Sequence, residues 1–253
     1  MRRHSKFQNR VLITRSSIKL LSRHPIPLHK YGTYAHNYSC TSQLKAETAT
    51  KMTTARYTVR FGSAQIETTV TSDTAAADEW VRSVRASNAG GRGGLIVGLD
   101  CEWKPNYHSW TTSKVAILQL CVGTTCLVLQ MFYVNRVPAA IRSLLGDPTV
   151  RCVGIGVGED AAKLADDYGL ACAAVVDLEA RCNQHLGIGG GMGRRTRLGL
   201  KGYAREVLGL TMEKPRHVTM SNWEKRQLDV AQVQYACIDA YVSYKLGERL
   251  LDN

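Results

Sequence analysis

The first regular pattern of hydrophobic and polar positions begins at residue 57. Segments 57–61 and 65–71 are rich in β-branched residues and flank a short turn that contains glycine, which is typical of two successive strands. Apolar positions then recur at the spacing of a helix, and Ser72 or Asp73 can cap its first turn. The pattern therefore predicts a strand pair followed by a helix.

The segment 95–103 has a strand pattern with two different faces. Because side chains alternate along a strand, the odd positions from Leu95 to Trp103 share one face, and all of them are apolar. The even positions share the other face and include Asp100 and Glu102. The apolar run before these acids is typical of a strand inside a sheet and argues against two exposed acids on an edge strand.

The rest of the chain continues with strand and helix patterns. In chain order they are the strands 115–123 and 126–132, a short helix from Pro138, the strand 150–158, the helix 159–168, a strand-to-helix junction at 175–186, and the helices 200–210 and 230–250. A meander of strands that later alternates with helices predicts an α/β domain, in which helices flank a mixed β-sheet.

The positive charge of the chain is concentrated in its first 51 residues. Residues 1–51 carry ten Lys/Arg and one acid, whereas residues 52–253 carry 23 Lys/Arg and 20 acids, a net charge of only +3. The overall charge of +12 is therefore weak evidence for nucleic-acid binding by the second part. We divide the chain into a basic leader, 1–51, and a folded domain, 52–253.

The leader has two interpretations, which the sequence leaves open. Residues 1–46 contain no acid and no sustained helix or strand period, a composition that fits an organellar transit peptide. An alternative upstream start fits equally well, with Met52 as the true beginning. We expect disorder over much of this segment in either case. The protein is expected in the nucleus or cytoplasm, or in a mitochondrion or plastid if the leader is a transit peptide.

The eight cysteines do not form a metal or disulfide pattern. No two of them make a CxxC pair, and no set with histidine has zinc-finger spacing. Several lie in apolar strand patterns, where cysteine packs as a small hydrophobic side chain. No apolar run approaches the roughly 18 residues of a membrane-spanning helix. We therefore predict reduced thiols in an intracellular protein without a membrane segment.

Carboxylates in three separate clusters carry the candidate chemistry. Asp100 and Glu102 project from one face of a strand, about 7 Å apart along the chain. Asp160 lies at the start of a helix. An acid at such a position commonly has no role beyond a favourable interaction with the helix dipole. Tyr235 and Asp239 are four residues apart and therefore share one face of a helix.

The helix that carries Asp239 is apolar on nearly all sides, so it is predicted to be buried. A buried carboxylate is costly unless it is paired. Divalent metal ions shared with Asp100 and Glu102 would supply the missing charge, and two ions held by carboxylates are the usual means of cutting a phosphodiester bond. Tyr235 alone could equally be a core tyrosine.

Three glycines before Asp160 suggest a different function. Gly154, Gly156 and Gly158 resemble part of a dinucleotide-binding loop, but the GxGxxG spacing requires glycine at position 159, which is glutamate. A nicotinamide-binding enzyme is therefore disfavoured. The same glycines can allow close approach of the backbone to a neighbouring element.

Taken together, these motifs resemble a known enzyme family. GLDCEW, KVAILQLCV, VGIGVGEDAAKLADDYGL, SNWEKRQL and VQYACIDAYVSYKL are similar to the DEDDy-type 3′–5′ exonuclease superfamily, and most of all to the Werner-syndrome-type exonuclease domain of short plant-like proteins without a helicase. The resemblance extends from about Leu95 to Leu250. Position 234 is glutamine, which excludes the sister branch that has histidine there. The resemblance implies a ribonuclease-H-like fold.

The resemblance also implies roles for the five motif residues. Asp100 would bridge two ions, Mg²⁺ or Mn²⁺, and Glu102 and Asp239 would complete the first site. Asp160 would hold the second ion, and Tyr235 would orient the attacking water. Hard oxygen ligands suit both of these ions. All five positions are intact, so we predict an active enzyme.

Five basic residues are candidates for contact with nucleic acid. Arg194, Arg195 and Arg197 lie in a glycine-rich loop and could meet phosphates, although a solvated loop is an equally good interpretation. Lys225 and Arg226 follow Trp223 just before the last helix and could line a channel for the strand.

These observations predict a metal-dependent 3′–5′ exonuclease that acts on a nucleic acid with a 3′ end, with DNA favoured over RNA and DNA repair as the setting. A helicase acting in trans is a candidate partner, which the sequence does not identify. One alternative is an RNA exonuclease of the ribonuclease D type, against which the segment WKPNY at 103–107 favours the Werner-like branch. Another is a nucleic-acid-binding pseudonuclease, which the intact motifs disfavour.

Overall fold

A mixed β-sheet forms the centre of the protein in the computed structural model, which describes residues 14–16, 54–89, 94–105, 112–188 and 197–251. Within these ranges the sheet has eight strands in the order β1-β2-β3-β6-β5-β4-β7-β8. The strands are β1 Thr14–Ser16, β2 Thr54–Phe61, β3 Ala64–Thr71, β4 Leu95–Trp103, β5 Val115–Val122, β6 Thr125–Leu129, β7 Val150–Gly154 and β8 Ala174–Asp177. The predicted α/β class with a mixed sheet is confirmed.

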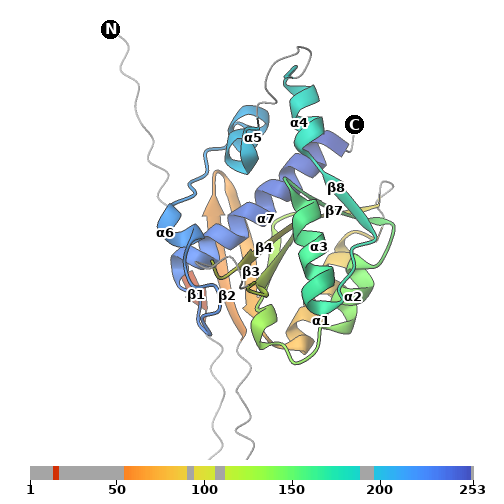
Figure 1. Ribbon diagram of the computed structural model, residues 1–253, viewed down its shortest axis with the longest axis vertical. Coiled ribbons are helices and arrows are strands. Elements are labelled where there is room, and N and C mark those ends of the chain that lie inside the picture. The colour runs from red at the N-terminus through yellow and green to blue at the C-terminus, as the bar shows by residue number, and fades with distance from the viewer. Residues whose placement is uncertain (1–13, 17–53, 90–93, 106–111, 189–196, 252–253) are drawn as a thin grey trace, which may run out of the picture.

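Helices cover both faces of this sheet (Figure 1). They are α1 Thr74–Ser87, α2 Ala139–Leu145, α3 Val157–Tyr168, α4 Glu179–His185, α5 Gly199–Leu208, α6 Arg216–Thr219 and α7 Val230–Leu251, with a short 3₁₀ turn, η1, at Met131–Tyr133. Buried side chains of α1, α2 and α3 pack with one face of the sheet, and those of α5 and α7 pack with the other. Two hydrophobic cores therefore lie on either side of the strands.

The predicted strand pair and its helix are present. β2 and β3 are antiparallel, with Phe61 opposite Ala64, and the turn between them uses Gly62 in the left-handed region at φ 58°. Asp73 caps α1, because its Oδ1 accepts a hydrogen bond of 2.9 Å from the backbone N–H of Ala75. Of the two predicted capping residues, Asp73 is therefore the one used.

Most of the leader lies outside the described residues. Within it, the three residues of β1 pair antiparallel with β2, with Arg15 opposite Tyr57. The predicted disorder and targeting role of the remainder are not described by the structure and stay predictions.

Two predicted strands are shorter than their sequence patterns. The strand predicted over 126–132 ends at Leu129 and passes into η1. The strand predicted over 150–158 ends at Gly154, and α3 begins at Val157 instead of Glu159. The physical reason is Gly156, whose φ of 75° ends the extended chain and starts the helix.

The cysteines pack as the sequence predicts. The seven that the structure describes are all free thiols, and all except Cys172 are buried. No helix in the described ranges is long and apolar enough to span a bilayer.

Candidate active site

The position of β4 inside the sheet determines where its two acids lie. β4 pairs antiparallel with β5 and parallel with β7, so it is not an edge strand. Val97 and Leu99 on its odd face belong to the core beneath α1 and α3, whereas Ile96 on its even face belongs to the core beneath α7. The predicted difference between the two faces is confirmed, and Asp100 and Glu102 share the α7 side.

Helix α7 crosses β4 at unusually short range. A Cβ atom on Gly98 would lie 2.1 Å from the carbonyl oxygen of Ala240 and 2.5 Å from the backbone nitrogen of Tyr244. Only glycine therefore permits this approach. The helix is buried along most of its length, as predicted from its apolar surface, and its Asp239 is 1% exposed.

This crossing brings three carboxylates together. Asp100 and Glu102 from β4 and Asp239 from α7 each offer an oxygen, and these oxygens all lie within 4.8 Å of one another. Asp100 and Glu102 are half-buried, so the group opens toward solvent on one side. We call these three residues the acidic cluster.

Asp160 lies beside the acidic cluster and not within it. It is in the first turn of α3, is half-buried, and is not part of the group whose oxygens meet within 4.8 Å. Its charge is nevertheless close enough to contribute to the raised pKa of Asp100. Burial, with a smaller contribution from the charge of Glu159, raises the pKa of Asp160 itself to about 7.

The charges of the acidic cluster are mutually unfavourable. Burial first, and then the charges of Asp239 and Asp160, raise the pKa of Asp100 well above its ordinary value. Burial and the charge of Asp239 raise the pKa of Glu102 to about 8. Burial also raises the pKa of Asp239. A site with this electrostatic character favours either bound protons or a bound cation.

The donor set fits a divalent cation. Both carboxylate oxygens of Asp239 are buried, and the ammonium of Lys214 lies 2.6 Å from Oδ2. The other oxygen, Oδ1, accepts no well-directed hydrogen bond from any residue that the structure describes. Such an atom is costly unless a cation or proton satisfies it. Carboxylate oxygens are the ligands that Mg²⁺ and Mn²⁺ prefer. The acidic cluster is therefore compatible with divalent metal, and the geometry does not decide which ion.

Tyr235 faces the acidic cluster from one turn before Asp239. It is 7% exposed, and its ring lies 5.8 Å from that of Trp223 between centroids. Burial and the charges of Asp239 and Glu102 raise the pKa of its hydroxyl, so this group stays protonated at neutral pH. A neutral hydroxyl at this place can donate a hydrogen bond.

Lys214 is a member of the site that sequence reasoning missed. Its Nζ lies 2.6 Å from Oδ2 of Asp239 and 5.2 Å from the centroid of the Tyr235 ring. The contact with Asp239 is an ion pair at short range that lacks the direction of a good hydrogen bond. Lys214 belongs to the connection between α5 and α6, where no periodic pattern could reveal its neighbours.

The raised pKa values predict that stability without metal falls as pH rises. The pKa of Glu102 is about 8 in the fold against 4.5 ordinarily, so in this window the folded state holds a proton that the unfolded chain releases. The stability that Glu102 contributes to the fold is therefore greatest below pH 4.5 and is lost as the pH rises toward about 8. In chelator, we expect the melting temperature to decline between about pH 5 and pH 8.

Glu102→Gln is the control for this prediction, because it removes one of the titrating groups and should make the decline shallower, while Asp160, whose pKa is about 7, continues to contribute. Saturating Mn²⁺ should also reduce it, since a cation replaces the proton. A melting temperature in chelator that rises over the same range would contradict the assignment of raised pKa values to this site.

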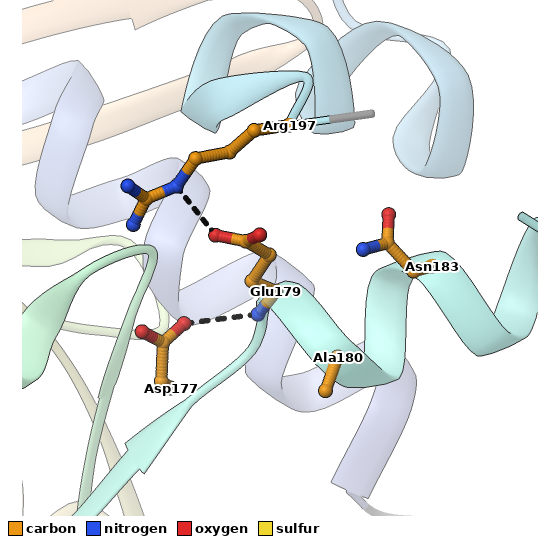
Figure 2. Close-up of a pocket in the computed structure, with 5 residues that line it drawn as sticks. All are labelled: Asp177, Glu179, Ala180, Asn183 and Arg197. Carbon is orange, nitrogen blue, oxygen red and sulfur yellow. Dashed lines mark hydrogen bonds and ion pairs between the residues drawn. The ribbon is translucent and has the colours of Figure 1, made fainter. Parts of the chain in front are cut away.

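Arg197 belongs to a separate hollow at the end of β8 (Figure 2). Its Nε lies 2.7 Å from Oε2 of Glu179, and Asp177 accepts hydrogen bonds from the backbone N–H groups of Glu179 and Gly156. The hollow has a volume of about 540 Å³ and is lined by Asp177, Glu179, Ala180, Asn183 and Arg197. The ion pair offsets the charge of Arg197, and its contact with phosphate stays a prediction. Arg194 and Arg195 lie outside the described residues.

Lys225 and Arg226 lie on a segment that is hydrogen-bonded to Gln130, the residue that follows β6. Their backbone carbonyls accept hydrogen bonds of 3.1 Å from Nε2 of Gln130. Lys225 forms an ion pair of 3.0 Å with Asp229, and the guanidinium of Arg226 lies 4.2 Å from the ring centroid of Tyr133. Both side chains are exposed, so they remain available to a strand, and this contact stays a prediction.

A comparison with protein families shows to which family the chain belongs. The family model described as 3′-5′ exonuclease matches residues 68–253, well over half of the chain. The chain belongs to the 3′-5′ exonuclease family. The match includes β4, α3 and α7, which carry the acidic cluster, Asp160 and Tyr235. The resemblance that the motifs predicted is confirmed, and the dinucleotide-binding interpretation is not supported.

Individual relatives agree with this family. A 3′-5′ exonuclease of Arabidopsis thaliana is 35% identical over 159 residues, which cover 62% of this chain and 53% of that protein. The bifunctional 3′-5′ exonuclease/ATP-dependent helicase WRN of Mus musculus is 29% identical over 158 residues, covering 62% of this chain and 11% of that protein. The chain thus spans about half the length of the first relative and a small part of the second.

A solved structure confirms the predicted fold. The exoribonuclease RNase D of Escherichia coli matches with a TM-score of 0.57 at 17% identity, over 72% of this chain and 44% of that one. At this identity the likeness shows the ribonuclease-H-like fold of the 3′-5′ exonuclease, and it does not show which nucleic acid is the substrate.

Proposed function

We propose that this chain is a metal-dependent 3′–5′ exonuclease that shortens DNA from its 3′ end. The observation that carries the proposal is the convergence of Asp100, Glu102 and Asp239 at the crossing of β4 and α7. Membership of the 3′-5′ exonuclease family supports the reaction class. The preference for DNA rests on the segment WKPNY at 103–107 and on the similarity to the mouse exonuclease/helicase.

Each of the five motif residues would have a role in binding metal or in orienting water. Asp100, Glu102 and Asp239 would hold one Mg²⁺ or Mn²⁺, and Asp160, which lies to one side, would hold a second with Asp100. Ions of this kind make water more acidic and offset the charge that develops on phosphate. The Tyr235 hydroxyl, which stays protonated, would orient the attacking water toward phosphorus by hydrogen bonding.

The reaction would be hydrolysis of the last phosphodiester bond. Water adds its oxygen to phosphorus, and the bond from phosphorus to the 3′ oxygen of the preceding nucleotide breaks. The departing oxygen takes up a proton, so the shortened strand keeps a 3′ hydroxyl and a nucleoside 5′-monophosphate is released. The enzyme contributes orientation and charge, and no group on the protein is modified.

The test is a digestion of matched DNA and RNA oligonucleotides of one sequence, labelled at the 5′ end. We expect a ladder of products shortened from the 3′ end, with faster loss of DNA, and no products in the presence of chelator. Faster digestion of RNA would reverse the substrate assignment in favour of the ribonuclease D-type alternative. Undiminished digestion in chelator would contradict metal dependence, and binding without turnover would indicate a pseudonuclease.

A further inference from the structure

Lys214 places a positive charge against the least exposed carboxylate of the site. Asp239 is 1% exposed and Lys214 is 30% exposed at the side chain, and their charged atoms lie 2.6 Å apart. The same ammonium lies over the face of Tyr235. Lys214 therefore contacts two residues of the proposed catalytic group at once.

The influence of Lys214 extends beyond this pair. Its charge opposes the raised pKa of Asp100, Glu102 and Asp160 as well as that of Asp239. One ammonium thus faces four carboxylates and offsets only part of their repulsion. Breaking a buried ion pair by removing one partner leaves the other charge uncompensated, which is strongly unfavourable.

The side chain of Lys214, and not the connection that carries it, would allow its ammonium to move. The chain between α5 and α6 has no regular structure, begins at Gly209 with φ 68° and ends at Pro215 before α6. Buried Met212 anchors this connection to the core, so movement is left to the side chain of Lys214. That side chain is a flexible four-carbon stem with a compact charge.

An ammonium and a divalent cation need the same oxygen atoms. A carboxylate bound to Mg²⁺ has the ion at about 2.1 Å, and a lysine in contact with that carboxylate would place two positive charges within a few ångströms in a poorly solvated site. Their repulsion opposes simultaneous contact. The two cations must therefore compete for Asp239, or the lysine must withdraw.

We propose that Lys214 is a built-in counter-ion of the acidic cluster, which stabilises the carboxylates and competes with a divalent cation for Asp239. The inference rests on the proposed metal-dependent function and adds a residue that controls the affinity for metal. The enzyme would bind its metal more weakly than the same four acids would without a lysine beside them. Lys214 would withdraw toward solvent when the metal binds.

The first test measures Mn²⁺ binding to the full chain by calorimetry, at one pH and ionic strength. Lys214→Met should bind Mn²⁺ about tenfold more tightly or better, the size expected for loss of one close charge pair in a buried setting. The matched control is Lys201→Met, since Lys201 forms an ion pair of 3.0 Å with the exposed Glu213, next to Lys214 in sequence. This control should leave the affinity unchanged.

Melting curves of the same proteins separate competition from damage to the fold. In chelator, Lys214→Met should melt several degrees below the original protein, and Mn²⁺ should remove most of the difference. Lys214→Arg keeps the charge and should resemble the original protein in both measurements. Equal Mn²⁺ affinity for the original protein and a folded Lys214→Met variant would overturn the proposal.

A second test uses the unaltered protein and so does not depend on the folding of a variant. Lysine side chains are modified by reductive methylation and the rate at each position is followed by mass spectrometry. Saturating Mn²⁺ should accelerate modification of Lys214 severalfold, with Lys201 as the internal reference. An unchanged rate at Lys214 while Mn²⁺ binds would refute withdrawal. Failure to bind Mn²⁺ at all would instead refute the metal-dependent function on which the inference rests.

Discussion

Replacing Asp100 with asparagine is expected to reduce exonuclease activity by at least about a thousandfold, because the charge stabilisation that metal ions supply to such reactions amounts to several kcal/mol. Asp100 offers a carboxylate oxygen within 4.8 Å of those of Glu102 and Asp239 and is the residue proposed to contact both ions. The variant keeps the shape of the side chain and loses only the charge and one oxygen ligand.

The fold should tolerate this change. Burial first, and then the charges of neighbouring acids, raise the pKa of Asp100, so removing its charge relieves both the cost of burying it and the repulsion. We therefore expect a melting temperature in chelator equal to or above that of the original protein. Activity is measured on a 5′-labelled oligonucleotide in Mg²⁺, together with the melting temperature of each preparation.

Asp166→Asn provides the matched control, because Asp166 is exposed on α3 and is not part of the acidic cluster. The same chemical change at this position should leave activity and stability close to those of the original protein. Full digestion by a folded Asp100→Asn variant would show that the acidic cluster is not the catalytic centre.

Replacing Gly98 with alanine is expected to destabilise the protein by about 3 kcal/mol or more, at the upper end of the costs of overpacking a core. The added methyl group would lie 2.1 Å from the carbonyl oxygen of Ala240, which is part of the backbone of α7 and cannot rotate away. Relief requires movement of α7 relative to β4, and this movement would also separate Asp239 from Asp100.

Gly158→Ala is the corresponding control. Gly158 lies in the first turn of α3, and a Cβ atom there would meet nothing within 4 Å. Since alanine favours helix over glycine by roughly 0.5–1 kcal/mol, this variant should be as stable as the original protein or slightly more so. Denaturant unfolding of the three proteins measures both effects. Equal stability of the two variants would contradict the close packing of α7 on β4.

The elements that sequence reasoning predicted best are those with a strong period. The alternation in β4 placed Asp100 and Glu102 on one face, and the nearly uniform apolar surface of α7 predicted its burial. Both inferences depend only on the geometry of a single strand or helix, which local sequence specifies. The boundaries near Gly156 were less accurate, because one left-handed residue ends a strand pattern that its neighbours would otherwise continue.

Two features of the site follow no local pattern. Lys214 is near Asp239 because the connection between α5 and α6 passes over α7, and its sequence neighbours carry no sign of that contact. Asp160 lies beside the acidic cluster because β7 pairs with β4 and α3, which carries Asp160 in its first turn, begins just after β7 ends. Distances between separate elements depend on packing, which a single sequence does not display.

By itself the sequence determined which residues could carry the chemistry, because motif spacing and side-chain periodicity are properties of the chain. Only the tertiary structure decided that Asp100, Glu102 and Asp239 meet within 4.8 Å, that Asp160 lies to one side and that Lys214 joins them. For the three carboxylates the physical reason is the contact at Gly98, where the absence of a side chain lets α7 approach β4 closely enough to bring Asp239 to Asp100 and Glu102. Asp160 and Lys214 lie on other elements, and the packing of those elements places them.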